Sequence, residues 1–231
     1  MSTRKSNQKK GDETLLNLVE VSSQAQSFLE KNRTLVFGLV GGLVVVALGI
    51  FLYKNFVSDP RQRDAVEQMF QAQVQFEKDS FKLALTNPGG GYSGFLDVID
   101  NYGGSKAGNL SKYYAGLCYL QLGQFDAAIS YLEDFNAAGE ITPAMKSGAL
   151  GDAYGEKGDL TKAMSLYQDA AKETDNEVIA SYYLKKVGML HEKNGNLAEA
   201  KAAYESIKKD YPDSPAAADV EKYIIRVSGG Q

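Results

Sequence analysis

Few side chains in this sequence could carry catalysis. The chain of 231 residues has one histidine, His191, and one cysteine, Cys118. A general base or a nucleophile needs partner groups that orient it, and zinc needs a cluster of ligands. The sequence pattern places no such partner groups or ligands beside either residue. The glycine-rich run 87–91 lacks the lysine and the following helix signal of a phosphate-binding loop. We therefore expect a protein that is not an enzyme and that holds no metal or cofactor.

The chemistry that the sequence does support is recognition by a surface, and a repeated spacing would build that surface. The pattern Gly-x-x-aromatic-x-x-x-Gly begins at Gly116, Gly151 and Gly188, so the leading glycines lie 35 and 37 residues apart. The first glycine of each copy allows two helices to approach closely, and the second suits the tight turn between them. His191 fills the aromatic position of the third copy, which favours a packed side chain over a base.

This pattern resembles the tetratricopeptide repeat, in which pairs of helices stack with a period near 34 residues. The resemblance predicts an all-α fold, a solenoid of helical hairpins whose first helices line a groove. We call the two helices of a repeat helix A and helix B, and we count each leading glycine as position 8 of helix A. In such repeats, positions 2, 5, 9, 12 and 13 of helix A face the groove. Residues at these positions give a candidate peptide site: Tyr113, Leu117, Gln121, Asp152, Glu156, Tyr182, Lys185, Met189 and Glu192.

The composition of this candidate groove suggests what it would bind. Its tyrosines, leucine and methionine suit extended or helical peptide segments, and its carboxylates favour a basic or neutral ligand. The alternative is that the same residues pack against the neighbouring repeat or against a terminal capping helix.

A separate element must place this surface in the cell. Residues 34–53 form a run of 20 residues without a charge, which as a helix crosses about 30 Å of hydrocarbon. The long segment before the run, and the lack of a small-x-small site after it, distinguish it from a cleaved signal peptide. Gly38 and Gly42 form a GxxxG motif, a candidate face for packing against another transmembrane helix. The sequence therefore predicts a single N-terminal transmembrane signal anchor in a lipid bilayer.

The distribution of charge predicts the orientation of this anchor. Residues 1–33 hold 6 of the chain's 25 basic and 4 of its 29 acidic residues, so the remainder is acidic. Basic tails stay in the cytoplasm, which places the large domain outside the cytoplasm. The acidic balance of that domain argues against nucleic acid as a partner. The single cysteine excludes an internal disulfide, which is compatible with this location.

The predicted elements divide the chain into three parts. Residues 1–33 form a cytoplasmic tail, in which the apolar spacing over 12–29 predicts a short amphipathic helix. Residues 34–53 form the anchor. The rest, 54–231, forms an extracytoplasmic repeat domain with a degenerate repeat at about 60–102, repeats at about 109–141, 144–175 and 181–212, and a capping helix at 215–227.

Two finer predictions concern the ends of helices. Apolar spacing predicts one unbroken helix from Arg63 to Leu85, ended by the glycine-rich run. Asp159 and Asn196 follow the turn glycines of the second and third copies, where a helix needs a capping side chain.

The order of tail, anchor and repeats resembles the YfgM-like family of membrane-anchored tetratricopeptide proteins, ancillary subunits of the bacterial SecYEG translocon. The segment from Ile207 to Pro215 is similar to the linkers between repeats of bacterial envelope proteins. The resemblance implies a place beside the Sec translocon in a bacterial inner membrane, with the repeat domain in the periplasm. Its implied partners are translocon subunits, periplasmic chaperones, and unfolded or secreted polypeptides.

Two other kinds of protein share this layout. A structural scaffold in envelope assembly or cell division stays open, because the sequence does not separate it from a translocon accessory. Mitochondrial import receptors share the outline but hold chaperone tails with five basic or amide side chains. The corresponding positions here are Tyr113, Leu117, Ala149, Tyr182 and Lys186, and only Lys186 fits, which disfavours that reading.

Overall fold

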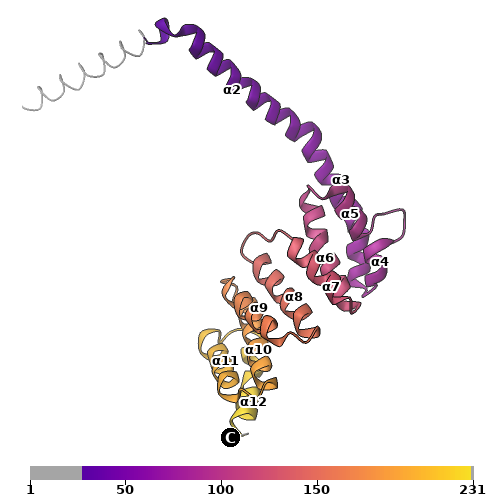
Figure 1. The fold of residues 1–231 in the computed structure, drawn as a ribbon, viewed down its shortest axis with the longest axis vertical. Helices are drawn as coiled ribbons and strands as arrows, with labels where there is room; N and C mark the ends of the chain where they lie inside the picture. Colours follow the sequence, from indigo (N-terminus) through magenta and orange to yellow (C-terminus); the bar gives the residue numbers. More distant parts are fainter. Residues whose placement is uncertain (1–27, 230–231) are drawn as a thin grey trace, which may run out of the picture. The chain divides into compact units, whose positions relative to one another are not determined.

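The computed structural model describes residues 28–229, and in this range every regular element is a helix (Figure 1). The chain divides into two compact units, with the boundary after Pro60. The amphipathic helix predicted at 12–29 lies almost entirely outside the described residues.

The first unit contains α2 (Arg33–Tyr53), which corresponds to the predicted anchor. None of its 21 residues is buried, and the helix is long and apolar enough to span a membrane. An added Cβ at Gly38 or Gly42 would meet no atom within 4 Å, so both glycines lie on an open helix surface. A π-helical turn, Lys54–Ser58, follows α2 directly, and no feature of the sequence pattern predicted it.

The second unit is a succession of helices, and from α4 onward each packs on the next in chain order. Their bounds are α3 (Asp59–Glu77), α4 (Phe81–Thr86), α5 (Phe95–Tyr102), α6 (Lys106–Gln121), α7 (Phe125–Asp134), α8 (Thr142–Glu156), α9 (Leu160–Lys172), α10 (Glu177–Lys193), α11 (Leu197–Asp210) and α12 (Ala217–Ser228). Three hairpins, α6–α7, α8–α9 and α10–α11, share one construction. In each, the first helix is helix A and the second is helix B.

The leading glycines hold helix A against helix B, as the pattern predicted. Each lies against one buried side chain of its own helix B: Gly116 against Leu132, Gly151 against Tyr167, and Gly188 against Tyr204. A Cβ at Gly151 would fall 2.7 Å from the Tyr167 ring, inside van der Waals contact. The turn glycines Gly123, Gly158 and Gly195 have φ of +72°, +87° and +79°, a left-handed conformation that glycine adopts without a steric penalty.

The helix predicted from Arg63 to Leu85 is wrong, because the chain turns at 78–80. Helix α3 ends at Glu77, Asp79 has φ of +55°, and α4 starts at Phe81. Aspartate tolerates this left-handed conformation better than most residues. The turn returns α4 to the core, where Ala84 and Leu85 are 0% and 3% exposed. Burial of these apolar side chains outweighs the continuation of one helix.

Helix α12 takes the place that helix A of a further repeat would occupy. Its Val220 and Val227 are buried against α11, and it is joined to α10 by ion pairs. Counted 37 residues on from Gly188, so that the buried Val220 and Val227 correspond to the buried Tyr183 and Leu190 of α10, Ile225 falls at the position of the leading glycine. Its side chain is 64% exposed.

Candidate peptide-binding site

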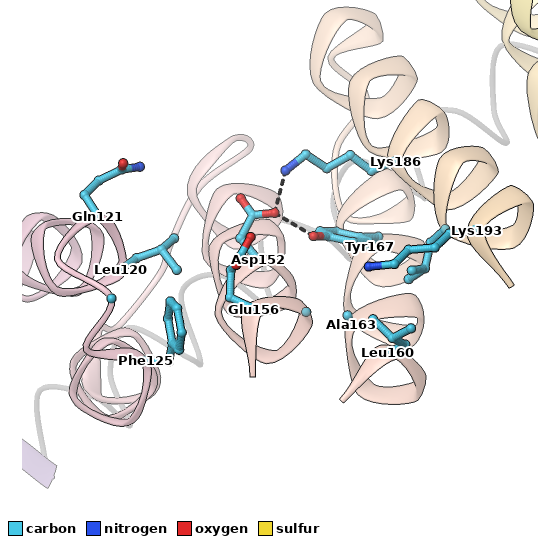
Figure 2. A pocket seen from close by; sticks show the side chains of 13 residues that line it. Leu120, Gln121, Phe125, Asp152, Glu156, Leu160, Ala163, Tyr167, Lys186 and Lys193 are labelled. Carbon is cyan, nitrogen blue, oxygen red and sulfur yellow. Dashed lines mark hydrogen bonds and ion pairs between the residues drawn. The ribbon is translucent and has the colours of Figure 1, made fainter. Parts of the chain in front are cut away.

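A cavity of about 610 Å³ opens among three consecutive hairpins of the second unit (Figure 2). We call it the central cavity. It is lined by Leu120, Gln121, Gly123, Phe125, Asp152, Gly155, Glu156, Leu160, Ala163, Tyr167, Lys186, Leu190 and Lys193. Its size is in the range of pockets that hold a small ligand or a few peptide side chains.

The walls of the central cavity have different chemistry. Leu120 and Phe125 come from the end of α6 and the start of α7, and Leu160 comes from the start of α9. These three side chains provide an apolar surface. Figure 2 shows Asp152 and Glu156 on α8 between Leu120 and Phe125 on one side and the lysines of α10 on the other, with Leu160 on the side of the lysines.

One side chain, Asp152, organises the polar part of the cavity. Its carboxylate accepts a hydrogen bond of 2.6 Å from the Tyr167 hydroxyl and pairs with the Lys186 ammonium at 2.5 Å. Burial, and then the hydrogen bond to Asp152, raise the pKa of the Tyr167 phenol. The Lys186 ammonium also lies 5.2 Å from the ring centroids of both Tyr167 and Tyr182, a cation–π distance.

This network changes the electrostatic character expected of the site. The carboxylates of the groove were expected to favour a basic or neutral ligand, but Lys186 already compensates the charge of Asp152 within the protein. Glu156 is the other acidic lining residue, and Lys193 is the other basic one. The lining therefore carries two charges of each sign, so it has no net preference for a cation.

The predicted groove residues separate into four groups in the structure. Gln121, Asp152 and Glu156 line the central cavity together. Tyr113 and Leu117 instead pack inward against the core cluster that contains Ala149 and Leu150.

The environment of Tyr113 is that of a core residue. Its ring centroid lies 5.4 Å from that of Phe135, and burial raises the pKa of its phenol to about 12. For Tyr113 and Leu117, packing against a neighbouring repeat is therefore the interpretation that the contacts support.

Lys185 and Glu192 are engaged by the capping helix. The Lys185 ammonium pairs with Asp219 at 2.7 Å, and the Glu192 carboxylate pairs with Arg226 at 2.5 Å. The hydrogen bond from Arg226 lowers the pKa of Glu192, although desolvation opposes it. These ion pairs support the alternative in which both side chains pack against the capping helix.

The last two predicted residues are exposed but lie outside the central cavity. Met189 is 47% exposed and contributes to a shallow pocket beside Lys186 and Lys193. Tyr182 is 50% exposed and lines a separate apolar hollow between the starts of α8 and α10.

Several lining residues of the central cavity were not predicted. Leu120 and Lys193 occupy positions 12 and 13 of helix A, so the same count, applied to every repeat, would have found them. Phe125 and Leu160 belong to the first turns of helices B, which a count along helix A does not reach.

The described residues show no arrangement for metal binding. Among residues 28–229, no three His, Cys, Asp or Glu side chains converge as potential ligands. Cys118 is buried, and burial raises the pKa of its thiol to about 12, which keeps it protonated at neutral pH.

Comparison with known proteins identifies the class. Models of the tetratricopeptide repeat match residues 111–137, 148–176 and 186–214, which correspond to the three hairpins. The chain is therefore an all-helical protein that carries tetratricopeptide repeats. Such repeats form protein–protein interaction modules, and the fold is typically a non-catalytic scaffold.

Solved structures with the same fold were also found. TPR-like repeats of a kinesin light chain from Podosopora anserina superpose with a TM-score of 0.58 at 13% identity, over 72% of this chain and 86% of that one. A point variant of that protein gives a TM-score of 0.57 at 14% identity, over 72% and 85% of the two chains. At this identity the likeness concerns the fold alone. No curated protein matches the chain in sequence.

Proposed function

We propose that this protein is a membrane-anchored interaction module that holds segments of other polypeptides in the central cavity. The observation that carries the proposal is the cavity itself. Apolar side chains from three hairpins converge on one open space of about 610 Å³, beside a charged network that is internally balanced. Such a site favours a neutral peptide segment with an apolar side chain, because burial of that side chain supplies most of the binding energy.

Residues 34–53 are the membrane anchor in this proposal. The apolar length of α2 supports a transmembrane position, and the basic residues of 1–33 support a cytoplasmic amino terminus. The repeats then lie on the periplasmic side of a bacterial inner membrane.

The proposed role is that of an accessory of the Sec translocon, which passes secreted polypeptides to periplasmic chaperones. Its support is the resemblance in layout to the YfgM-like family and the presence of an interaction module behind an anchor. An unfolded chain leaving the membrane exposes apolar side chains, and the central cavity suits that chemistry. Contacts of this kind give micromolar rather than nanomolar affinity, since ordering a flexible segment offsets much of the gain.

Photocrosslinking in intact membranes tests the proposal. A photoreactive amino acid at Phe125 reports on the central cavity, and one at Lys201 on the exposed side of α11 is the matched control. We expect Phe125 to capture nascent secreted polypeptides and Lys201 to capture none. Equal capture at both positions would place the contact elsewhere, and capture of cytoplasmic proteins alone would reverse the orientation.

A further inference from the structure

A second hollow on the repeat domain is almost entirely apolar. It has a volume of about 260 Å³ and is lined by Met145 from α8 and by Val178, Ile179, Tyr182 and Tyr183 from α10. We call these five residues the apolar hollow; none of them lines the central cavity. Val178 is 53% exposed and Tyr182 50% exposed, so large apolar side chains face solvent together. Grouped apolar residues on a surface mark sites where another molecule docks.

The shape of the apolar hollow is fixed by the protein. The Asn176 side chain accepts hydrogen bonds from the backbone amides of Val178 and Ile179, at 3.1 and 3.2 Å, which holds the first turn of α10. The Tyr182 ring packs edge-to-face on the Tyr183 ring, with the centroids 5.1 Å apart. A ligand would therefore meet a preformed surface and lose little binding energy to reorganisation.

Acidic residues flank the segments that form the apolar hollow. Asp175 and Glu177 come just before Val178, and Glu140 comes five residues before Met145, in the bend that precedes α8. All three carboxylates are on exposed residues, and we call them the acidic border. Glu173, in the same loop, accepts a hydrogen bond of 2.6 Å from Ser147.

The basic side chains nearby do not cancel this border. The Lys146 ammonium donates to the carbonyls of Glu133 and Phe135, at 2.9 and 2.7 Å. Lys186 pairs with Asp152. Lys172, in the last turn of α9, is the single basic residue in the segment 172–177, which holds three acidic ones. The Lys146 ammonium keeps its charge in those hydrogen bonds, but Lys146 and Lys172 are two cations against the four carboxylates of the acidic border and Glu173. The surroundings of the apolar hollow are therefore net negative.

We propose that the apolar hollow and the acidic border together dock a polypeptide segment whose apolar side chains are flanked by Lys or Arg. The apolar side chains leave water on binding, and the basic flanks are attracted by the border. The same border disfavours a segment with acidic flanks. This site is separate from the central cavity and does not depend on the function proposed for it.

Tryptophan fluorescence provides the measurement, because the chain has no tryptophan of its own. The full-length protein is placed in nanodiscs of zwitterionic lipid. Two peptides share one apolar core containing a tryptophan, one with lysine flanks and one with glutamate flanks. We expect the lysine-flanked peptide to bind at micromolar concentration with a blue-shifted emission, and the glutamate-flanked peptide to bind at least about tenfold more weakly. Empty nanodiscs give the contribution of the lipid.

Variants then locate the peptide. Val178→Ser is expected to weaken the lysine-flanked peptide about tenfold, through lost apolar contact. The pair Asp175→Asn with Glu177→Gln is expected to weaken it about threefold, through lost attraction. Val66→Ser is the matched control, since Val66 is 55% exposed on α3, and it should leave the affinity unchanged. Circular dichroism confirms that each variant keeps its helices.

Three results would overturn the inference. Equal affinity for the two peptides would show that the acidic border does not contribute to binding. Binding that survives Val178→Ser but is lost in Phe125→Ser would move the peptide to the central cavity, and so favour the proposed function while rejecting this site. Self-association that Val178→Ser abolishes, seen by sedimentation, would make a second copy of the chain the occupant of the apolar hollow.

Discussion

Asp152 on α8 and Lys186 on α10 are 34 residues apart in sequence, and their side chains form an ion pair. The same separation recurs in Lys185–Asp219 and in Glu192–Arg226, which join α10 to α12. From α8 through α10 to α12, each of these helices is thus tied to the next by ion pairs between side chains. These ties fix how each helix A is rotated against the next, which apolar packing alone specifies less strictly.

A double-mutant cycle should measure the strength of the Asp152–Lys186 tie. We expect Asp152→Asn and Lys186→Met to show a coupling free energy of about 1 kcal/mol in urea unfolding, because both side chains are partly shielded from water. The control pair is Lys201–Glu205, at 3.9 Å on exposed residues, where coupling should be close to zero. Strict additivity at Asp152 and Lys186 would contradict the expectation.

Gly148 on α8 should be intolerant of even one methyl group. An added Cβ there would overlap the hydroxyl end of the Tyr183 ring, and Tyr183 is only 9% exposed, so the ring has little room to move. We expect Gly148→Ala to lower the free energy of unfolding by about 1–3 kcal/mol, through overpacking.

Gly104→Ala is the matched control for this substitution. A Cβ at Gly104 meets no atom within 4 Å. Thermal unfolding of both variants checks the prediction, and an unchanged midpoint for Gly148→Ala would mean that α10 shifts freely against α8.

The contact between Glu192 and Arg226 should make stability depend on pH. The hydrogen bond from Arg226, aided by one from Tyr204, lowers the pKa of Glu192 below its ordinary value. The ionised carboxylate therefore stabilises the fold above the unfolded pKa of about 4.3, and this stabilisation is lost as the pH falls through the lower, folded value.

Glu192→Gln isolates this effect. We expect the variant to unfold at a lower temperature than the parent at pH 6, and the difference to shrink as the pH falls below about 4. A difference in melting temperature that stays constant from pH 6 to pH 3 would exclude the ionisation of Glu192 as its cause.

Residues 61–231 should fold without the anchor. The four apolar core clusters of the described residues lie entirely within this unit. We expect the fragment to be helical, to unfold cooperatively and to need no detergent. A fragment that aggregates or shows no cooperative transition would mean that residues before Arg61 supply part of its stability.

The hairpins were predictable because each depends on local rules. Gly151 and Gly158 mark a close approach and a turn by their residue type, and Asp159 caps α9 by accepting from the Lys162 amide at 3.0 Å. The other predicted cap is wrong, because the Asn196 side chain makes no capping hydrogen bond at the start of α11. The turn at 78–80 was not predictable in this way. It depends on the burial of Ala84 and Leu85 beneath helices that come later in the chain, and no local pattern encodes that contact.

The candidate site was predictable to a smaller degree. The helix A count reached Gln121, Asp152 and Glu156, but it also included Lys185 and Glu192, which α12 covers. A count along one helix says which way a side chain points, and it cannot say what lies opposite. The identity of the ion-pair partner, such as Lys186 for Asp152, is likewise a property of the stacked repeats.

Ile225 sets a limit on how this array can grow. A glycine at the corresponding place of each earlier repeat admits a second helix at close range, whereas Ile225 presents a branched side chain that is 64% exposed. Another hairpin partner could not approach α12 as α11 approaches α10 without displacing that side chain. For an engineer who wishes to add a repeat after α12, Ile225→Gly is therefore the first substitution to make. Without it, the Ile225 side chain prevents a further helix B from packing closely on α12.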